Sequence, residues 1–145
     1  MEPVGLHRKG EVDLNLILES LQHHPAYRKA GAVASFVGVV REEPIRGGVG
    51  NVSHLEYEAY EEVAVRRLEE IRESMLEHSG IIEVSIHHVI DKLSVGEPSL
   101  LVAVLGKHRQ EVFKTLAEIV ELLKKDVPIW KKEFTEKEAY WVSAK

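Results

Sequence analysis

The segment from Arg109 to Lys125 carries the strongest structural signal in the chain. Its apolar residues recur at i, i+4, i+7 and i+11, the spacing of one helix face, at positions Val112, Leu116, Ile119 and Leu123. Pro128 follows and cannot continue a helix, because its ring fixes φ and removes the amide hydrogen. We therefore predict a long amphipathic helix, followed directly by an extended segment from Ile129 to Phe134.

Shorter segments with helix and strand patterns occupy the rest of the chain. Asp13 can cap a helix that reaches about Gln22, and a second helix is expected from Glu61 to Glu77, with Gly80 as its stop signal. Strands are expected over four ranges: Ala32 to Val40, which reads as buried, Val52 to Tyr57, Ile81 to Ile90 and Ser99 to Leu105. The last two should form a hairpin through the turn at Gly96 to Pro98. This mixed order predicts an α+β fold, with a mainly antiparallel sheet and flanking helices, in one domain of residues 1–145.

Composition excludes several classes of function. The chain has no cysteine, so it has no disulfide, cysteine-based zinc site or thiol nucleophile, and any sulfur that it handles must come from another molecule. Its formal net charge of -5 argues against nucleic acid as a partner. The longest apolar run is about half of the ~20 residues that a bilayer span needs, and no signal peptide is evident. We expect a cytoplasmic protein with no membrane partner.

A basic cluster stands at the start of the long helix. Lys107, His108 and Arg109 lie where the helix dipole disfavours positive charge, which suggests that an anion binds there. The free amides of the first turn, with His108 and Arg109, would form a phosphate site. In the alternative interpretation this is a solvated loop whose charges pair with nearby glutamates.

A second basic cluster follows the helix. Lys124 and Lys125 lie in its last turn, where the helix dipole alone favours cations. Lys131 returns a few residues later, next to Trp130, which could exclude water. Two lysines facing one dry pocket would depress each other's pKa, as catalytic lysines require. Arg41, directly after the predicted strand from Ala32 to Val40, is placed to join such a site.

Metal and cofactor sites are not expected. His87 and His88 are adjacent on a predicted strand, so their side chains point to opposite faces and cannot share one metal ion. The glycine-rich segment from Gly47 to Gly50 lies between two predicted strands rather than before a helix, so it is interpreted as a flexible loop and not as a phosphate loop.

An ordered set of short motifs resembles one family, the large catalytic subunit of molybdopterin synthase, known as MoaE. The motifs cover most of the chain from Gly31 onward and are the segments 31–33, 36–41, 55–60, 95–97, His108-Arg109 with Phe113, Leu123-Lys124, 128–133 and 140–142. The resemblance implies an α/β hammerhead type of fold. It also implies a homodimer that binds two copies of a small ubiquitin-like sulfur carrier, giving a heterotetramer.

The same resemblance implies a sulfurtransferase. The carrier's C-terminal Gly-Gly thiocarboxylate would donate sulfur to cyclic pyranopterin monophosphate, and the product would be molybdopterin. Carried over by motif, Lys124 and Lys131 match the essential lysines of the family. The substrate-binding positions carried over are Val39, Val40, Arg41, His108, Arg109, Lys124, Lys131, Lys132 and Glu133.

Five of these residues have a physical role that follows from their chemistry. His108 and Arg109 would hold the phosphate, and Arg41 would neutralise the anionic substrate or the thiocarboxylate. The two lysines would transfer protons or stabilise the charge that develops as sulfur attacks. A helix from Arg109 to Lys124 is about 22 Å long at 1.5 Å per residue, too long for one small substrate to touch both ends. We therefore expect His108 and Arg109 from one subunit and the lysines from the other.

The sequence departs from the family motif at two positions, and two other classes of function remain as alternatives to a sulfurtransferase. Val89 and Asp91 stand where the family usually has arginine and glycine, which puts in doubt an anion-binding role for that strand. A non-catalytic dimeric binding module for a small phosphorylated ligand would keep the pocket without turnover. A nucleotide-binding regulatory protein would bind common nucleotides and ignore pterins.

Overall fold

The computed structural model describes residues 1–45, 50–135 and 139–141. Gly47 and Gly48 of the predicted loop, and Val142 of the closing motif, lie outside the described residues. The helices are α1 (Leu14–Gln22), α2 (Glu61–Leu76), α3 (Arg109–Asp126) and the 3-10 turn η1 (Tyr27–Lys29). The strands are β1 (Val4–His7), β2 (Ala32–Val39), β3 (His54–Ala59), β4 (Ile81–Val89), β5 (Lys92–Ser94), β6 (Pro98–Gly106), β7 (Ile129–Phe134) and β8 (Ala139–Trp141).

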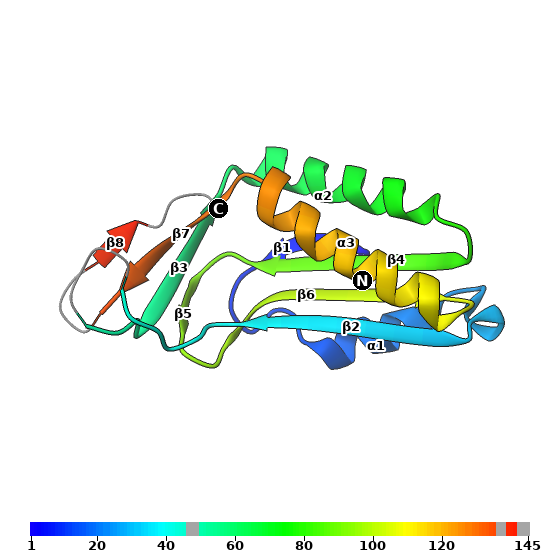
Figure 1. Cartoon of the computed structure of the whole chain (residues 1–145), viewed down its shortest axis with the longest axis horizontal. Coiled ribbons are helices and arrows are strands. Elements are labelled where there is room, and N and C mark those ends of the chain that lie inside the picture. Colours follow the sequence, from blue (N-terminus) through cyan, green and yellow to red (C-terminus); the bar gives the residue numbers. More distant parts are fainter. Residues whose placement is uncertain (46–49, 136–138, 142–145) are drawn as a thin grey trace.

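The strands form two sheets of four. The first has the order β1-β4-β6-β2, in which β1 pairs with β4 in parallel and the other pairs are antiparallel. The second has the order β5-β3-β7-β8 and its pairs are all antiparallel. Figure 1 shows the second sheet at one end of the first. The predicted α+β class, with mainly antiparallel pairing, is confirmed.

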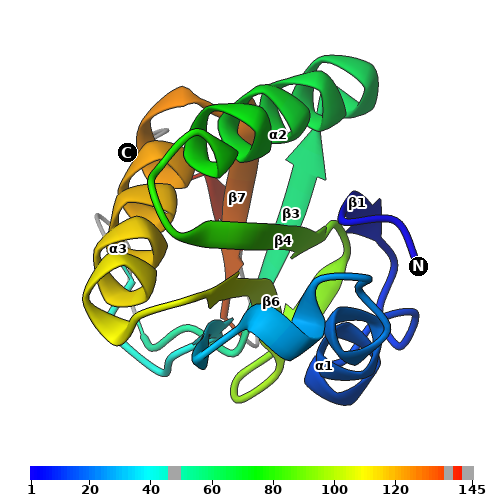
Figure 2. The same ribbon diagram turned by 90° about the vertical axis from the view of Figure 1, so that its right-hand side faces the viewer.

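Helices cover both faces of the first sheet. α2 packs over β4 and β1, and α3 packs over β6 and β2, while α1 lies on the opposite face (Figure 2). The alternation along β6 supplies both cores: Leu100, Val102 and Val104 pack with α2 and α3, whereas Leu101, Ala103 and Leu105 pack with α1. None of the described helices is long and apolar enough to cross a membrane.

The helix ends follow the predicted signals. Asp13 is the N-cap of α1, and its carboxylate accepts a hydrogen bond from the amide of Leu16 at 2.9 Å. α2 ends at Leu76, and Gly80 then adopts φ +78, a left-handed conformation that favours glycine. α3 runs without a break from Arg109 to Asp126, and β7 begins directly after Pro128, as predicted.

Two of the strand predictions were wrong in part. The segment from Ala32 to Val40 was expected to be a buried strand, but β2 is an edge strand whose residues alternate between half-buried and exposed. The hairpin of β4 and β6 is also interrupted, because β5 lies between them in the chain and pairs with β3 in the second sheet. Apolar runs identify strands but not their place in a sheet.

The adjacent histidines of β4 are both buried and face opposite ways. The Nδ1 atom of His87 lies 2.8 Å from Nε2 of His7, and its Nε2 lies 2.8 Å from the hydroxyl of Ser85. His88 packs edge-on against the ring of Tyr57. Burial lowers the pKa of His87 to about 4, helped by the neighbouring charge of His7, and burial likewise lowers the pKa of His88 to about 4.

Because these histidines are buried, we expect the free energy of unfolding of the protein to decrease in mild acid. Above pH 6.5 each ring is neutral in both states, so its contribution is constant. As the pH falls from 6.5 toward 4, the two rings become protonated in the unfolded chain but stay neutral in the folded chain. The free energy of unfolding therefore falls by up to about 1.4 kcal/mol per pH unit for each ring.

Urea unfolding measured at pH values from about 7.5 to about 5 checks this expectation, because this range spans the ordinary pKa of histidine. The His87→Asn variant keeps a polar group beside Ser85 but cannot titrate, so its free energy of unfolding should fall less steeply than that of the wild type. Equal slopes in the two proteins would show that His87 does not govern acid stability.

Candidate functional site

Arg41 lies at the end of β2 with its side chain in solvent. The strand end is held by two backbone hydrogen bonds, from the amide of Val40 to the carbonyl of Glu97 and from the amide of Gly96 to the carbonyl of Val40. Val40 is buried and Val39 is exposed. The guanidinium of Arg41 contacts Glu43 at 2.7 Å, and its side chain is 78% exposed, so it is accessible to an anionic ligand.

Lys124 and Lys131 lie near the same end of the first sheet as Arg41. Lys124 is exposed in the last turn of α3, and Lys131 is half-buried on β7. The register pairs Lys131 with Tyr57 and Glu133 with Leu55, so these side chains share the inner face of the second sheet, where Leu55 joins the core. Glu133 is only 2% exposed and its Oε1 has no hydrogen-bond partner among the described residues.

The neighbours of Lys131 in sequence point the other way. Trp130 and Lys132 lie on the outer face of the second sheet, because successive side chains of a strand alternate. Trp130 packs edge-on against Tyr60 at a centroid distance of 4.8 Å. The expectation that Trp130 shields Lys131 from water was therefore wrong, and the side chains of Lys131 and Lys132 project from opposite faces of β7.

Lys132 has a basic neighbour that sequence reasoning missed. The ammonium of Lys92 lies 4.4 Å from the centroid of the Phe134 ring, and the ammonium of Lys132 lies 5.6 Å from it. Glu56 pairs with Lys92 on one side and with Lys132 on the other, so the three charges form a row across the sheet. No sequence signal identifies this row, because it depends on the register of three strands.

His108 and Arg109 begin α3 at its other end. His108 occupies the N-cap position but makes no side-chain cap bond, so it leaves first-turn amides uncapped. Its Nδ1 lies 3.8 Å from Glu111, both side chains being substantially exposed. The contact between His108 and Glu111 is the kind of pairing expected if this segment were only a solvated loop whose charges pair with nearby glutamates. Arg109 forms no ion pair among the described residues.

The predicted site residues fall into two sets on one chain, one toward each end of the first sheet, although Lys132 faces away from Lys131 and Glu133 on β7. The first is Val39, Val40, Arg41, Lys124, Lys131, Lys132 and Glu133, and the second is His108 and Arg109. Because α3 is unbroken, Arg109 and Lys124 are about 22 Å apart along its axis, and the two ends of β2 are about 23 Å apart at 3.3 Å per residue. Figure 1 shows the start of α3 near the start of β2, whereas α3 crosses the sheet obliquely and ends beside α2, where Asp126 contacts Arg67.

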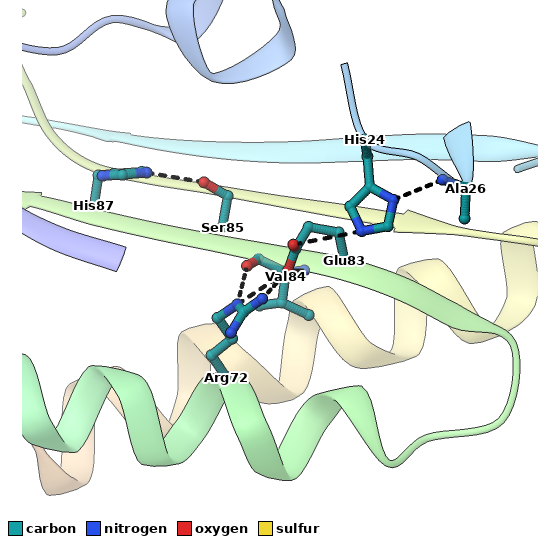
Figure 3. Close-up of polar contacts among 7 residues, drawn as sticks. All are labelled: His24, Ala26, Arg72, Glu83, Val84, Ser85 and His87. Atoms are coloured by element: carbon teal, nitrogen blue, oxygen red, sulfur yellow. Dashed lines mark hydrogen bonds and ion pairs between the residues drawn. The ribbon is translucent and has the colours of Figure 1, made fainter. Parts of the chain in front are cut away.

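A polar cluster elsewhere borders a small cavity that the predicted site residues do not line. The cavity, about 150 Å³, is lined by residues that include His24, Glu83 and Ser85. Glu83 accepts hydrogen bonds from Nε and Nη2 of Arg72 at 3.0 and 2.6 Å, and its other oxygen lies 3.7 Å from Nε2 of His24 (Figure 3).

This cluster has no free metal ligand. The amide of Ala26 donates to Nδ1 of His24 at 3.0 Å, so in the neutral ring the proton sits on Nε2 and points toward Glu83. Among the described residues no group of three or more histidine and acidic side chains is arranged to hold a metal ion. The cluster joins α2, β4 and the segment after α1 structurally.

The chain matches one family over most of its length. The family model described as "MoaE protein" matches residues 7–126. The molybdopterin synthase catalytic subunit of Pyrococcus abyssi is 41% identical over 112 residues, which cover 77% of this chain and 74% of the relative. That of Bacillus subtilis is 38% identical over 115 residues, covering 79% and 71%.

Solved structures agree. The X-ray crystal structure of molybdopterin synthase from Staphylococcus aureus superposes with a TM-score of 0.86 at 30% identity, covering 99% of this chain and 98% of that one. A protein-protein complex of subunits 1 and 2 of molybdopterin-converting factor from Helicobacter pylori gives 0.79 at 22% identity, covering 98% and 91%, a likeness of fold alone. Sequence and structure thus agree over nearly the whole chain, which belongs to the MoaE protein family.

Proposed function

We propose that this protein is the catalytic subunit of a molybdopterin synthase. It converts cyclic pyranopterin monophosphate to molybdopterin with sulfur from the C-terminal thiocarboxylate of a small ubiquitin-like carrier subunit, and it acts in the cytoplasm. The observation that carries the proposal is the match to relatives named as molybdopterin synthase catalytic subunits over more than two thirds of the chain. The accessible cations at the ends of β2 and α3 support it, since the substrate and the sulfur donor are both anions.

The start of α3 is suited to the substrate phosphate. Amides of the first helical turn point out of the helix, and the helix dipole adds positive potential at this end. Arg109 can offer two parallel donors to phosphate oxygens, and it has no ion pair among the described residues that would have to break. His108 would exchange its contact with Glu111 for the phosphate.

The other group of residues is suited to the sulfur transfer. Arg41 can neutralise the thiocarboxylate or the substrate, while Lys124 and Lys131 exchange protons or stabilise developing negative charge. The chain has no cysteine, so the attacking sulfur belongs to the carrier. The Helicobacter pylori structure is a complex of two different subunits, which supports a carrier bound in the same manner here.

The active site is shared between two copies of the chain. His108 and Arg109 come from one subunit, and Arg41 with the two lysines comes from its partner, because a small substrate cannot span the ~22 Å between the ends of α3. The assembly proposed is a homodimer with one carrier bound to each catalytic subunit, a heterotetramer.

Removal of either lysine should abolish turnover. We expect Lys124→Ala and Lys131→Ala to lower the conversion of cyclic pyranopterin monophosphate by about 100-fold or more, the usual contribution of a positioned proton-transfer group. Lys125→Ala is the matched control, since Lys125 is also exposed in the same helical turn and should keep wild-type turnover. Fluorescence of the oxidised pterin product measures the rate, and carrier binding shows that each variant is folded.

The outcome of this assay also separates the classes of function. If the wild type gives no turnover with a carrier and a substrate that another synthase accepts, the protein is a non-catalytic binding module. Binding of common nucleotides without pterin binding would instead indicate a nucleotide-dependent regulator.

Mixed dimers test the shared site. Arg109→Ala and Lys124→Ala chains should each be inactive alone. Co-expressed in equal amounts they should recover about a quarter of wild-type turnover, because half of the dimers are mixed and each mixed dimer has one intact site of two. No recovery in mixed dimers, separated by two different affinity tags, would place the whole site within one chain.

A further inference from the structure

Tyr57 of β3 lies where the two sheets meet. It stands directly opposite Lys131 in the pairing of β3 with β7, and its backbone amide donates to the carbonyl of Asp91 at 3.0 Å. Asp91 follows β4 of the first sheet, and β5 of the second sheet begins at the next residue. The ring of Tyr57 packs edge-on against His88 of β4, with 5.0 Å between the ring centroids. Tyr57 therefore contacts both sheets.

The hydroxyl of Tyr57 is hydrogen-bonded to Ser99, the first buried residue of β6. The hydroxyl of Ser99 donates to the carbonyl of Gly38 at 3.3 Å. A serine hydroxyl has one proton to donate, and Gly38 accepts it, so Tyr57 is the donor in its bond to Ser99. Burial raises the pKa of Tyr57, so the phenol keeps the proton that this bond needs. A continuous hydrogen-bonded chain, the Tyr57 link, thus runs from β3 through Ser99 to the backbone of β2.

Gly38 is the point at which β2 leaves its regular pairing with β6. The register of the two strands shifts between Gly38 and Val39. A Cβ atom at Gly38 would lie 3.4 Å from Leu100 and 3.7 Å from the hydroxyl of Ser99, so the two strands approach closely here. The Tyr57 link therefore holds the backbone of β2 three residues before Arg41.

The ring of Tyr57 is also the aromatic group on the face of Lys131. Residues directly opposite in an antiparallel pair have Cβ atoms about 4.5 to 5.5 Å apart, so the two side chains leave the inner face of the second sheet side by side. The ring is half-buried and packs against the core on the α1 side. Trp130 lies on the outer face. Tyr57 therefore has the place beside the lysine stem that Trp130 was expected to have.

We propose that Tyr57 is a positioning residue for sulfur transfer, which holds Lys131 of the second sheet in a fixed position relative to Arg41 of the first sheet. Its ring flanks the aliphatic stem of Lys131, and its hydroxyl holds the end of β2 through Ser99 and Gly38. This inference rests on the proposed function, because it takes Arg41 and Lys131 as parts of the reacting site. Tyr57 itself exchanges no proton with the substrate, since its hydroxyl is committed to Ser99.

The Tyr57 link differs in kind from the backbone bonds at the end of β2. The amide of Val40 donates to the carbonyl of Glu97, and the amide of Gly96 donates to the carbonyl of Val40. These two bonds attach β2 to the turn before β6, within the first sheet. Tyr57 belongs to β3, in the second sheet. Since reacting groups need to be held within about 0.5 Å of their productive positions, a link between the two sheets matters for the rate.

Hydrogen exchange tests the Tyr57 link without substrate or carrier. The Tyr57→Phe variant keeps the ring and loses the hydroxyl. We expect the amides of Val40 and Gly96, whose bonds hold the end of β2, to exchange about fivefold faster than in the wild type, as loss of one hydrogen bond predicts. The amide of Gly31, which is hydrogen-bonded at the start of β2, should exchange at the wild-type rate. Unchanged rates at all three amides would overturn the link.

Tyr60→Phe is the matched control, because it removes the same hydroxyl from a tyrosine that is 66% exposed, and it should leave these rates unchanged. Ser99→Ala removes the middle of the chain and should accelerate exchange at the same amides. The double variant of Tyr57→Phe and Ser99→Ala should be no faster than Ser99→Ala alone, since both substitutions break one chain. Effects that multiply in the double variant would show that the two hydroxyls act independently, which contradicts the link.

Kinetics test whether the link serves turnover. Tyr57→Phe should lower kcat about tenfold and leave KM within about twofold, because a misplaced reacting group slows the chemical step more than it weakens binding. Tyr57→Leu also removes the ring beside Lys131, so its kcat should fall further, to about 100-fold below the wild type. Tyr60→Phe should keep wild-type kinetics, and circular dichroism confirms that each variant is folded. A wild-type kcat in Tyr57→Phe would overturn the positioning role.

The two proposals fail separately. Absence of turnover in the wild type would remove the synthase, and the exchange rates would still decide whether Tyr57 links the two sheets. Turnover that Tyr57→Phe leaves unchanged would keep the synthase and remove the positioning role of Tyr57.

Discussion

Burial of β6 on both faces is the constraint on which the rest of the structure depends. All of its residues from Ser99 to Gly106 are buried, and its side chains alternate between the core under α2 and α3 and the core over α1. A strand buried in this way must have neighbours on both edges and cover on both faces, because unpaired backbone groups in a core are costly. β4, β2, α3 and α1 meet that requirement, and the positions of the candidate site residues follow from theirs.

The candidate site residues lie at the ends of these elements. β2 and β6 are antiparallel, and α3 returns over them from the end of β6. The chain therefore places His108 and Arg109 where α3 starts, Lys124 where α3 ends, and Arg41 just after the end of β2. Such an arrangement keeps like charges apart within the chain, which limits their repulsion.

The departures from the family pattern are accommodated within the fold. Val89 joins the core over α1, so the position usually held by arginine contributes packing here. The carboxylate of Asp91 accepts hydrogen bonds from the amides of Lys9 and Lys92, at 3.1 and 2.8 Å, which hold its pKa below the usual range. The carbonyl of the preceding residue, Ile90, accepts from the guanidinium of Arg8 at 2.6 Å. The segment after β1 thus secures this turn.

The sequence by itself determined the elements, their caps and the family. The periodicity of α3, the cap at Asp13, the break at Pro128 and the strand of Ile129 to Phe134 are local effects, set by side-chain spacing and backbone sterics that any context preserves. What only the tertiary structure decided depends on contacts between distant segments. β2 is an edge and not a central strand, β5 leaves the hairpin for the second sheet, and Trp130 turns away from Lys131. The register of β3 against β5 and β7 places Lys92 and Lys132 on either side of Glu56. No local pattern encodes a register across three strands, because each register depends on the burial of residues far away in the chain.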